Sequence, residues 1–163
     1  MAVICLFFAI QTAGYGLYGD TWAYQGFVED IKREVPPNDR VFMEDTSGRL
    51  ALLSQRAFVS GDGLVNSNRY LDRYLLTGRI GDFLKESHIQ YFLTSNIQCY
   101  PYRKVMPWTR TIGPVYKTYR LVVDLSYLTR LPVIPSIVEI PVENLVFDKC
   151  VNGIREMLFW LGK

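Results

Sequence analysis

The sequence predicts an α/β fold, with a small, mainly parallel sheet and flanking helices arranged as Rossmann-like βαβ units. Up to about residue 95, short apolar segments of strand length alternate with amphipathic segments of helical length. This alternation is the order of βαβ units. The chain has 163 residues, 49% of them hydrophobic and 21% charged. It can therefore bury a sizeable core, and its composition is not that of a disordered protein.

The first 18 residues, MAVICLFFAIQTAGYGLY, contain no charged side chain. A membrane-spanning helix needs about 20 mostly apolar residues, so this segment is just short of a full span. A secretory signal peptide carries a basic residue before its apolar core, whereas the first basic residue here is Lys32. We therefore expect residues 1–19 to be the end of a transmembrane helix and residues 20–163 to form an extracytoplasmic α/β domain. The alternative is a buried helix or strand of a soluble domain.

The first half of the domain predicts helices and strands in alternation. Asp20 can cap a helix that begins near Trp22 and ends at the Pro-Pro pair after it. The elements expected after this helix are a strand at 40–44, a helix at 49–55, a strand at 57–60, a helix at 67–76, a helical piece at 80–88 and a strand at 89–94. In the helix at 49–55, we expect Leu50, Leu52 and Leu53 to face the core. Strands joined by helices of this length predict parallel pairing.

The second half of the domain has a different pattern. Residues 99–120 contain three prolines and many aromatic and basic side chains, which predicts a long connection. Residues 119–125 predict a strand. Any strand within 133–147 must be short or lie at an edge, because this segment contains two prolines. The apolar residues of 151–161 recur at helical spacing and predict a closing helix.

Four residues near the ends of predicted strands are candidate ligand contacts. They are Asp45, Arg49, Asp62 and Asn66. In an open α/β sheet, ligands bind outside the carboxyl ends of the strands, where the two carboxylates could share a cation or receive sugar hydroxyls. The glycines that flank Asp62 allow positive φ and leave its carboxylate accessible. The alternative is that Asp45 caps the next helix and Asp62 holds its own turn.

Other kinds of site have weaker support. Residues 46–49 could hold a phosphate at a helix N-terminus, but they lack the glycines and lysine of a P-loop. A single histidine, His88, excludes a multi-histidine metal site, and its position after a helix is favourable for the helix dipole. Cys99 and Cys150 could pair in an oxidising compartment, with buried free thiols as the alternative. We assign no catalytic residue, no metal site and no cofactor.

Residues 100–120 combine aromatic and basic side chains. Such a segment can contact anionic headgroups or a lipid-linked phosphate, stack on sugars or bind single-stranded nucleic acid. The net charge of only +2 and the apolar N-terminus favour headgroups or a lipid-linked phosphate, so we predict no nucleic-acid partner. The alternative is a surface loop packed by its own tyrosines.

The order of these segments resembles a known family. An apolar helix is followed by YQGFVEDIKREVPPNDRVFMEDTSGRLALLSQRAFVSGDGLVNS and then by a helix and strand ending in GRIGDFLKESHIQYFL. This resembles the extracytoplasmic C-terminal region of polytopic GT-C-type membrane glycosyltransferases, which are polyprenyl-phosphate-sugar-dependent and mannosyltransferase-like. The resemblance covers residues 5–95, and the DGLVN element, Asp62 to Asn66, is its most specific part.

The resemblance implies an extracytoplasmic domain that helps to position a lipid-linked sugar donor or acceptor. The implied partners are membrane lipid, a polyprenyl-phosphate sugar and the membrane portion of a glycosyltransferase. The catalytic carboxylates of the family lie in an early loop between membrane helices, a part not found in this sequence. We therefore expect a non-catalytic fragment or split subunit of such an enzyme. The alternative is a stand-alone, membrane-anchored envelope domain that binds or scaffolds without enzymatic activity.

Overall fold

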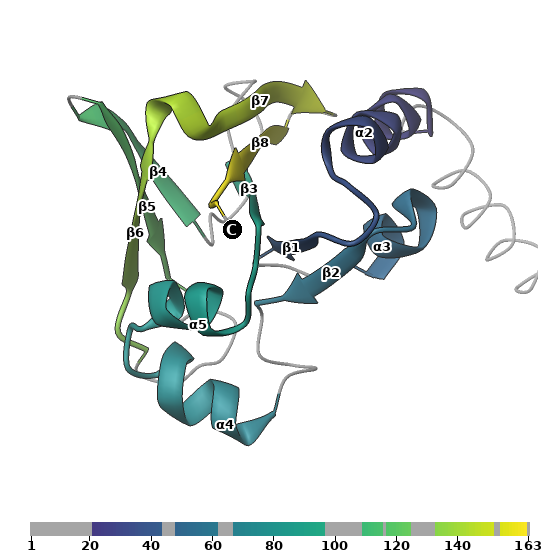
Figure 1. Ribbon diagram of the computed structural model, residues 1–163. Helices are drawn as coiled ribbons and strands as arrows, with labels where there is room; N and C mark the ends of the chain where they lie inside the picture. Colours follow the sequence, from purple (N-terminus) through teal and green to yellow (C-terminus); the bar gives the residue numbers. More distant parts are fainter. Residues whose placement is uncertain are drawn as a thin grey trace, which may run out of the picture.

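Two β-sheets and the helices around them make up the described structure. The computed structural model describes residues 21–43, 48–61, 67–96, 109–115, 117–124, 133–151 and 154–162. Figure 1 shows a three-stranded sheet on the far side of the molecule from the helices α2 (Thr21–Glu34) and α3 (Gly48–Ser54), with the strands of a five-stranded sheet between them. Within these ranges, no helix has the length and apolar character needed to cross a bilayer. The transmembrane segment expected over residues 1–19 lies outside them.

The larger sheet has five strands in the order β2-β1-β3-β8-β7. The strands are β1 (Arg40–Met43), β2 (Ala57–Ser60), β3 (Tyr91–Asn96), β7 (Leu145–Val151) and β8 (Ile154–Trp160). Strand β1 pairs in parallel with β2 and β3, whereas β8 pairs antiparallel with β3 and β7. The sheet is therefore mixed.

The smaller sheet is antiparallel throughout, in the order β4-β5-β6. Its strands are β4 (Thr109–Val115), β5 (Thr118–Val123) and β6 (Ser136–Pro141). Strand β6 lies at an edge, directly after Pro135, and ends at Pro141. The expectation that a strand in this region is short or lies at an edge is confirmed. Proline has no backbone N–H to donate to a neighbouring strand, so it is tolerated at strand ends and edges.

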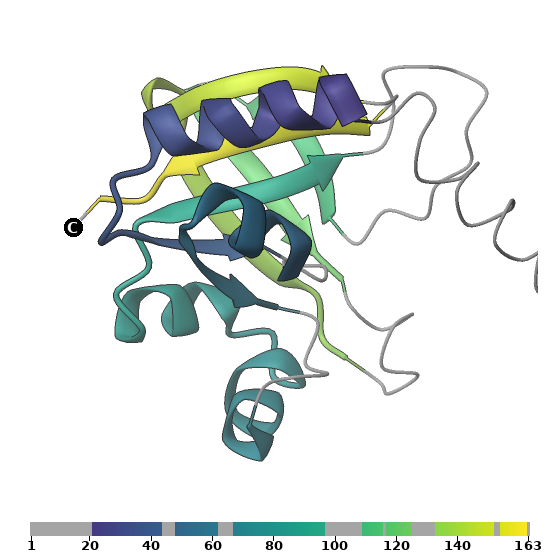
Figure 2. The same ribbon diagram turned by 90° about the vertical axis from the view of Figure 1, so that its right-hand side faces the viewer.

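The helices cover both faces of the five-stranded sheet. They are α2 (Thr21–Glu34), α3 (Gly48–Ser54), α4 (Asn68–Tyr70), the π-helix η1 (Leu71–Leu75), α5 (Ile80–Glu86) and the 3-10 helix η2 (Val142–Asn144). Helices α2 and α3 lie in front of this sheet in Figure 2, and the three-stranded sheet lies behind it. Helices α4 and α5 close the lower end of the space between the two sheets in both views.

The core has two layers because neighbouring residues of a strand point to opposite faces. Val41 and Leu93 belong to the cluster that α2 covers. Phe42, Phe92 and Phe159 belong to the cluster between the sheets and α5. All five side chains are fully buried. Each contributes roughly 1.5–3 kcal/mol to stability.

The prediction of a mainly parallel, Rossmann-like sheet is wrong. Only two of the four pairings in the described five-stranded sheet are parallel, and the second sheet has none. The error arises mainly at residues 151–161, which were expected to form a helix and instead contain β8. Met157, Leu158 and Phe159 are buried on both faces of the sheet. Such a continuous apolar run cannot be told from a buried helix by periodicity alone.

Two further expectations are corrected. Residues 99–120 were expected to be a long connection, but 109–115 form β4 and pair with β5. In α3, Leu50 is buried as expected, whereas Leu52 is 77% exposed and Leu53 is 42% exposed. Helix α3 has only seven residues, so it can bury only one narrow stripe against its neighbours.

The expected helices and strands in the rest of the first half are confirmed, with their ends shifted by a few residues. Asp62 and Gly63 of the predicted turn lie outside the described residues, but Gly61 before them is described. Its φ is not in the left-handed region, but a Cβ there would lie 2.3 Å from Cζ of Phe42. Glycine is thus required at this strand end by the close approach of a buried ring.

Candidate functional site

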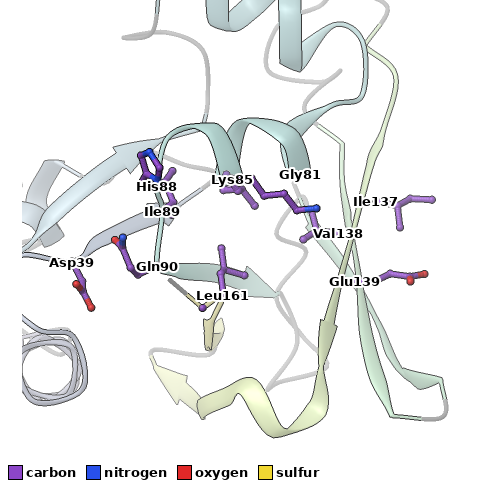
Figure 3. Close-up of a pocket in the computed structure, with 12 residues that line it drawn as sticks. Asp39, Gly81, Lys85, His88, Ile89, Gln90, Ile137, Val138, Glu139 and Leu161 are labelled. Carbon is purple, nitrogen blue, oxygen red and sulfur yellow. The ribbon is translucent and has the colours of Figure 1, made fainter.

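A cavity of about 870 Å³ lies between α5 and β6. This volume is within the range of about 300–1,000 Å³ that is common for small-molecule sites. Its apolar wall is formed by Leu84, Ile89, Val138 and Leu161. In Figure 3, Leu161 lies below α5, on the same side of β6 as that helix. The cavity can therefore receive a hydrocarbon group.

The way α5 ends positions the polar groups at the cavity mouth. His88 donates its backbone N–H to the carbonyl of Lys85 at 3.1 Å, and Ile89 donates to the carbonyl of Leu84 at 3.0 Å. With His88 at φ 50°, these bonds form a Schellman motif. The motif turns the chain sharply from α5 into β3. It buries Ile89 beside Leu84 and leaves His88 exposed.

Lys85 lines the cavity, as do the carboxylates Asp39 and Glu139. Its side chain extends from α5 toward β6, whereas Ile137 and Glu139 point away from the cavity (Figure 3). Gln90 is already engaged, since its Oε1 accepts the backbone N–H of Arg40 at 2.8 Å. Within the described part of the chain, Lys85 forms no ion pair. The mouth therefore presents one ammonium group, Lys85, and the carboxylate of Asp39 also lines the cavity.

Among the described lining residues, His88 is accompanied by two carboxylates, Asp39 and Glu139. Within the described ranges, no serine, threonine or cysteine lines the cavity beside His88. Among the residues that the structure describes, no group of three histidine, cysteine, aspartate or glutamate side chains could hold a metal ion. An apolar wall with a few polar groups at the mouth is a common arrangement in small-molecule sites.

Of the four predicted ligand contacts, only one is described. Arg49 is exposed at the start of α3. It does not line the cavity, because α3 packs with α2 on the other face of the five-stranded sheet. Asp45, Asp62 and Asn66 lie outside the described residues. The strands before these residues do end side by side, with Met43 opposite Ser60.

Sequence reasoning missed this cavity. His88 was interpreted only through the dipole of the helix before it, and Lys85 was not singled out. The available signal for this site was a helical piece at 80–88 that ends in polar residues and is followed by an apolar strand. The facing wall comes from β6, about fifty residues later in the chain, and no local pattern indicates that contact.

Cys150 on β7 is exposed and disulfide-bonded. The alternative of buried free thiols is therefore wrong for this residue. Cys5 and Cys99 lie outside the described residues.

Comparison with known proteins adds no assignment, since no family model, curated protein or solved structure matches this chain.

Proposed function

We propose that this chain is a non-catalytic, extracytoplasmic domain of a GT-C-like membrane glycosyltransferase. In this proposal, it positions a lipid-linked sugar by binding the isoprenoid-phosphate part between α5 and β6. The observation that carries the proposal is the cavity with a hydrocarbon wall and Lys85 at its mouth. The motif order that resembles this family supports the same assignment.

The chemistry of an isoprenoid phosphate matches the two parts of the cavity. The isoprenoid end can displace water from Leu84, Ile89, Val138 and Leu161, and each buried methylene contributes about 0.8 kcal/mol. The phosphate needs a cation, which Lys85 supplies as a flexible point charge. His88 is exposed at the same mouth and can donate a second hydrogen bond.

The disulfide at Cys150 supports the extracytoplasmic location. Disulfides persist in oxidising compartments and are rare in the cytosol. This support is independent of the cavity and of the family resemblance.

The test is photo-crosslinking of the full-length chain in lipid nanodiscs. The probe is a short isoprenyl phosphate with a diazirine at its apolar end, and the matching uncharged isoprenol is its control. We expect mass spectrometry to place the cross-links in peptides from α5 or β6. Lys85→Gln should weaken competition by unlabelled isoprenyl phosphate by about tenfold, the worth of one charge-assisted hydrogen bond, and should leave the isoprenol unaffected.

Lys117→Gln is the matched control, because Lys117 is also exposed and does not line the cavity. It should bind the phosphate probe like the unchanged chain. Cross-links spread over the whole domain, or equal effects of the two lysine substitutions, would refute the proposed function.

A further inference from the structure

A second hollow, of about 260 Å³, lies on a different face of α5, between α5 and the helical segment of α4 and η1. Polar side chains surround an aromatic floor. The rim includes Ser67, Arg69, Tyr74 and Glu86, and the floor includes Tyr70 and Phe83. We infer that this hollow binds a single neutral sugar ring. This inference does not depend on the proposed function of the first cavity.

Glu86 is held in place as a hydrogen-bond acceptor. Tyr74 donates its hydroxyl to Oε2 of Glu86 at 2.5 Å, and Arg73 donates to Oε1 at 3.1 Å. A carboxylate can accept about four hydrogen bonds, so lone pairs remain for a ligand. The hydrogen bond to Glu86 raises the pKa of Tyr74. The phenol therefore stays protonated, and its own oxygen can accept a further hydrogen bond.

The floor is the partly exposed ring of Phe83, and the buried ring of Tyr70 supports it from below. The rings of Tyr70 and Phe83 meet edge to face with centroids 4.7 Å apart. Tyr70 is also fixed at its far end, because its hydroxyl donates to the carbonyl of Gly61 at 2.9 Å. A sugar ring has apolar C–H faces that suit such a surface, and this contact needs no large apolar cavity.

The polar rim suits hydroxyl groups better than an anion or a hydrocarbon. Ser67 and Arg69 can donate, and Glu86 and the oxygen of Tyr74 can accept. A sugar hydroxyl both donates and accepts, so it can satisfy both kinds of partner at once. An anion would meet the carboxylate of Glu86 on the rim. The volume is below the range of about 300–1,000 Å³ for larger ligands, which limits the occupant to one ring.

The backbone beside this hollow is unusual in a way that also indicates function. Leu71–Leu75 form a π-helix, in which Leu76 donates its backbone N–H to the carbonyl of Leu71 at 3.0 Å. Helical turns of this kind are rare, and they occur frequently at functional sites. Here the π-helix carries Tyr74, the residue that fixes Glu86.

The test is an NMR titration of the full-length chain, kept in solution by an amphipol, with the methyl α-glycosides of mannose, glucose and galactose. We expect at least one glycoside to give saturable amide shifts at Ser67, Arg69, Glu86 and Ser87. Glu86→Gln should weaken the binding of that glycoside by about tenfold, because a charge-assisted acceptor is lost. Inorganic phosphate should give no saturable shift at these residues.

Asp72→Asn is the matched control, since Asp72 is an exposed carboxylate on η1 that does not line the hollow. It should bind the glycoside unchanged. Thermal unfolding of both variants shows whether they are folded, and Arg69→Gln provides a second rim variant if Glu86→Gln does not fold. Absence of saturable shifts with all three glycosides would overturn the inference, as would saturable binding of phosphate in place of sugar. Lys85→Gln should leave glycoside binding intact, which separates this result from failure of the proposed function.

Discussion

His88 ends helix α5 in a left-handed backbone conformation, and it also lines the mouth of the larger cavity. Its φ of 50° is in the left-handed region, where glycine is the usual residue and other side chains are strained by about 1–2 kcal/mol. The position lets Ile89 reach the core beside Leu84. The strain is retained at a residue that lines the larger cavity, and strained backbone tends to cluster at ligand sites.

We predict that His88→Gly stabilises the protein by about 0.5–1 kcal/mol, because relief of left-handed strain exceeds the entropic cost of glycine. Urea unfolding measured by circular dichroism should show the higher midpoint. His88→Val should lower the midpoint, since a β-branched side chain fits this conformation worst. A glycine variant less stable than the unchanged chain would contradict this account of the turn.

At the scale of elements, the β7–β8 hairpin is held by a paired charge at its exposed surface. Arg155 on β8 donates from Nε to Oδ1 of Asp148 on β7 at 2.7 Å, and a second bond joins Nη2 to Oδ2. These bonds lower the pKa of Asp148 from its ordinary value of 3.8, although partial burial raises it. The fold is therefore stabilised by the ionised form of this side chain.

We predict that the contribution of Asp148 is present above about pH 4 and disappears as the pH falls through the folded-state pKa. The lowered pKa in the folded state means that acid protonates the unfolded chain first. Asp148→Asn should reduce stability at neutral pH by no more than about 1 kcal/mol, since the pair is partly exposed to solvent. Unfolding free energies measured between acid and neutral pH should then show a shallower slope for the variant. Equal slopes would exclude this role.

The elements also show where sequence reasoning succeeds. Helix 21–34 and the strands at 40–43 and 57–60 were predicted because their apolar spacing is regular and their ends carry proline or polar signals. Strand β8 was missed because both of its faces are buried, which removes the alternation that identifies a strand. Strand β4 was missed because it contains Pro114 and lies in a segment, 99–120, whose prolines and basic residues are typical of a loop.

At the scale of the whole molecule, the arrangement of the sheets depends on contacts between distant segments. The helical piece that forms one wall of the α5–β6 cavity was predicted, and an edge strand was allowed for in the segment that forms the other, but the contact between them was not predicted. Ser136 at the start of β6 accepts the backbone N–H of Ile80 at 3.2 Å, across 56 residues. Lys85 and Val138 line the same cavity only because the folded chain packs α5 against β6. The predicted contacts Asp45, Asp62 and Asn66 stay predictions.

The disulfide at Cys150 gives a prediction for the stability of the whole domain. We expect Cys150→Ser to lower the free energy of unfolding by about 2–4 kcal/mol, because the cross-link restricts the unfolded chain. Thermal unfolding of the oxidised protein measures this loss. Reductant should lower the midpoint of the unchanged chain and have no effect on the variant. An unchanged chain that ignores reductant would argue against a stabilising cross-link. Parallel Cys5→Ser and Cys99→Ser variants identify the partner.

Strand β8 sits between β3 and β7, although it is the last strand in the described chain. During synthesis on the ribosome, the side of β3 that pairs with β8 therefore stays without its partner strand until residues 154–160 have been made. An unpaired apolar edge of this kind invites association with other chains. Because β8 is synthesised after the other described strands, the nascent domain is most prone to aggregation just before β8 emerges from the ribosome.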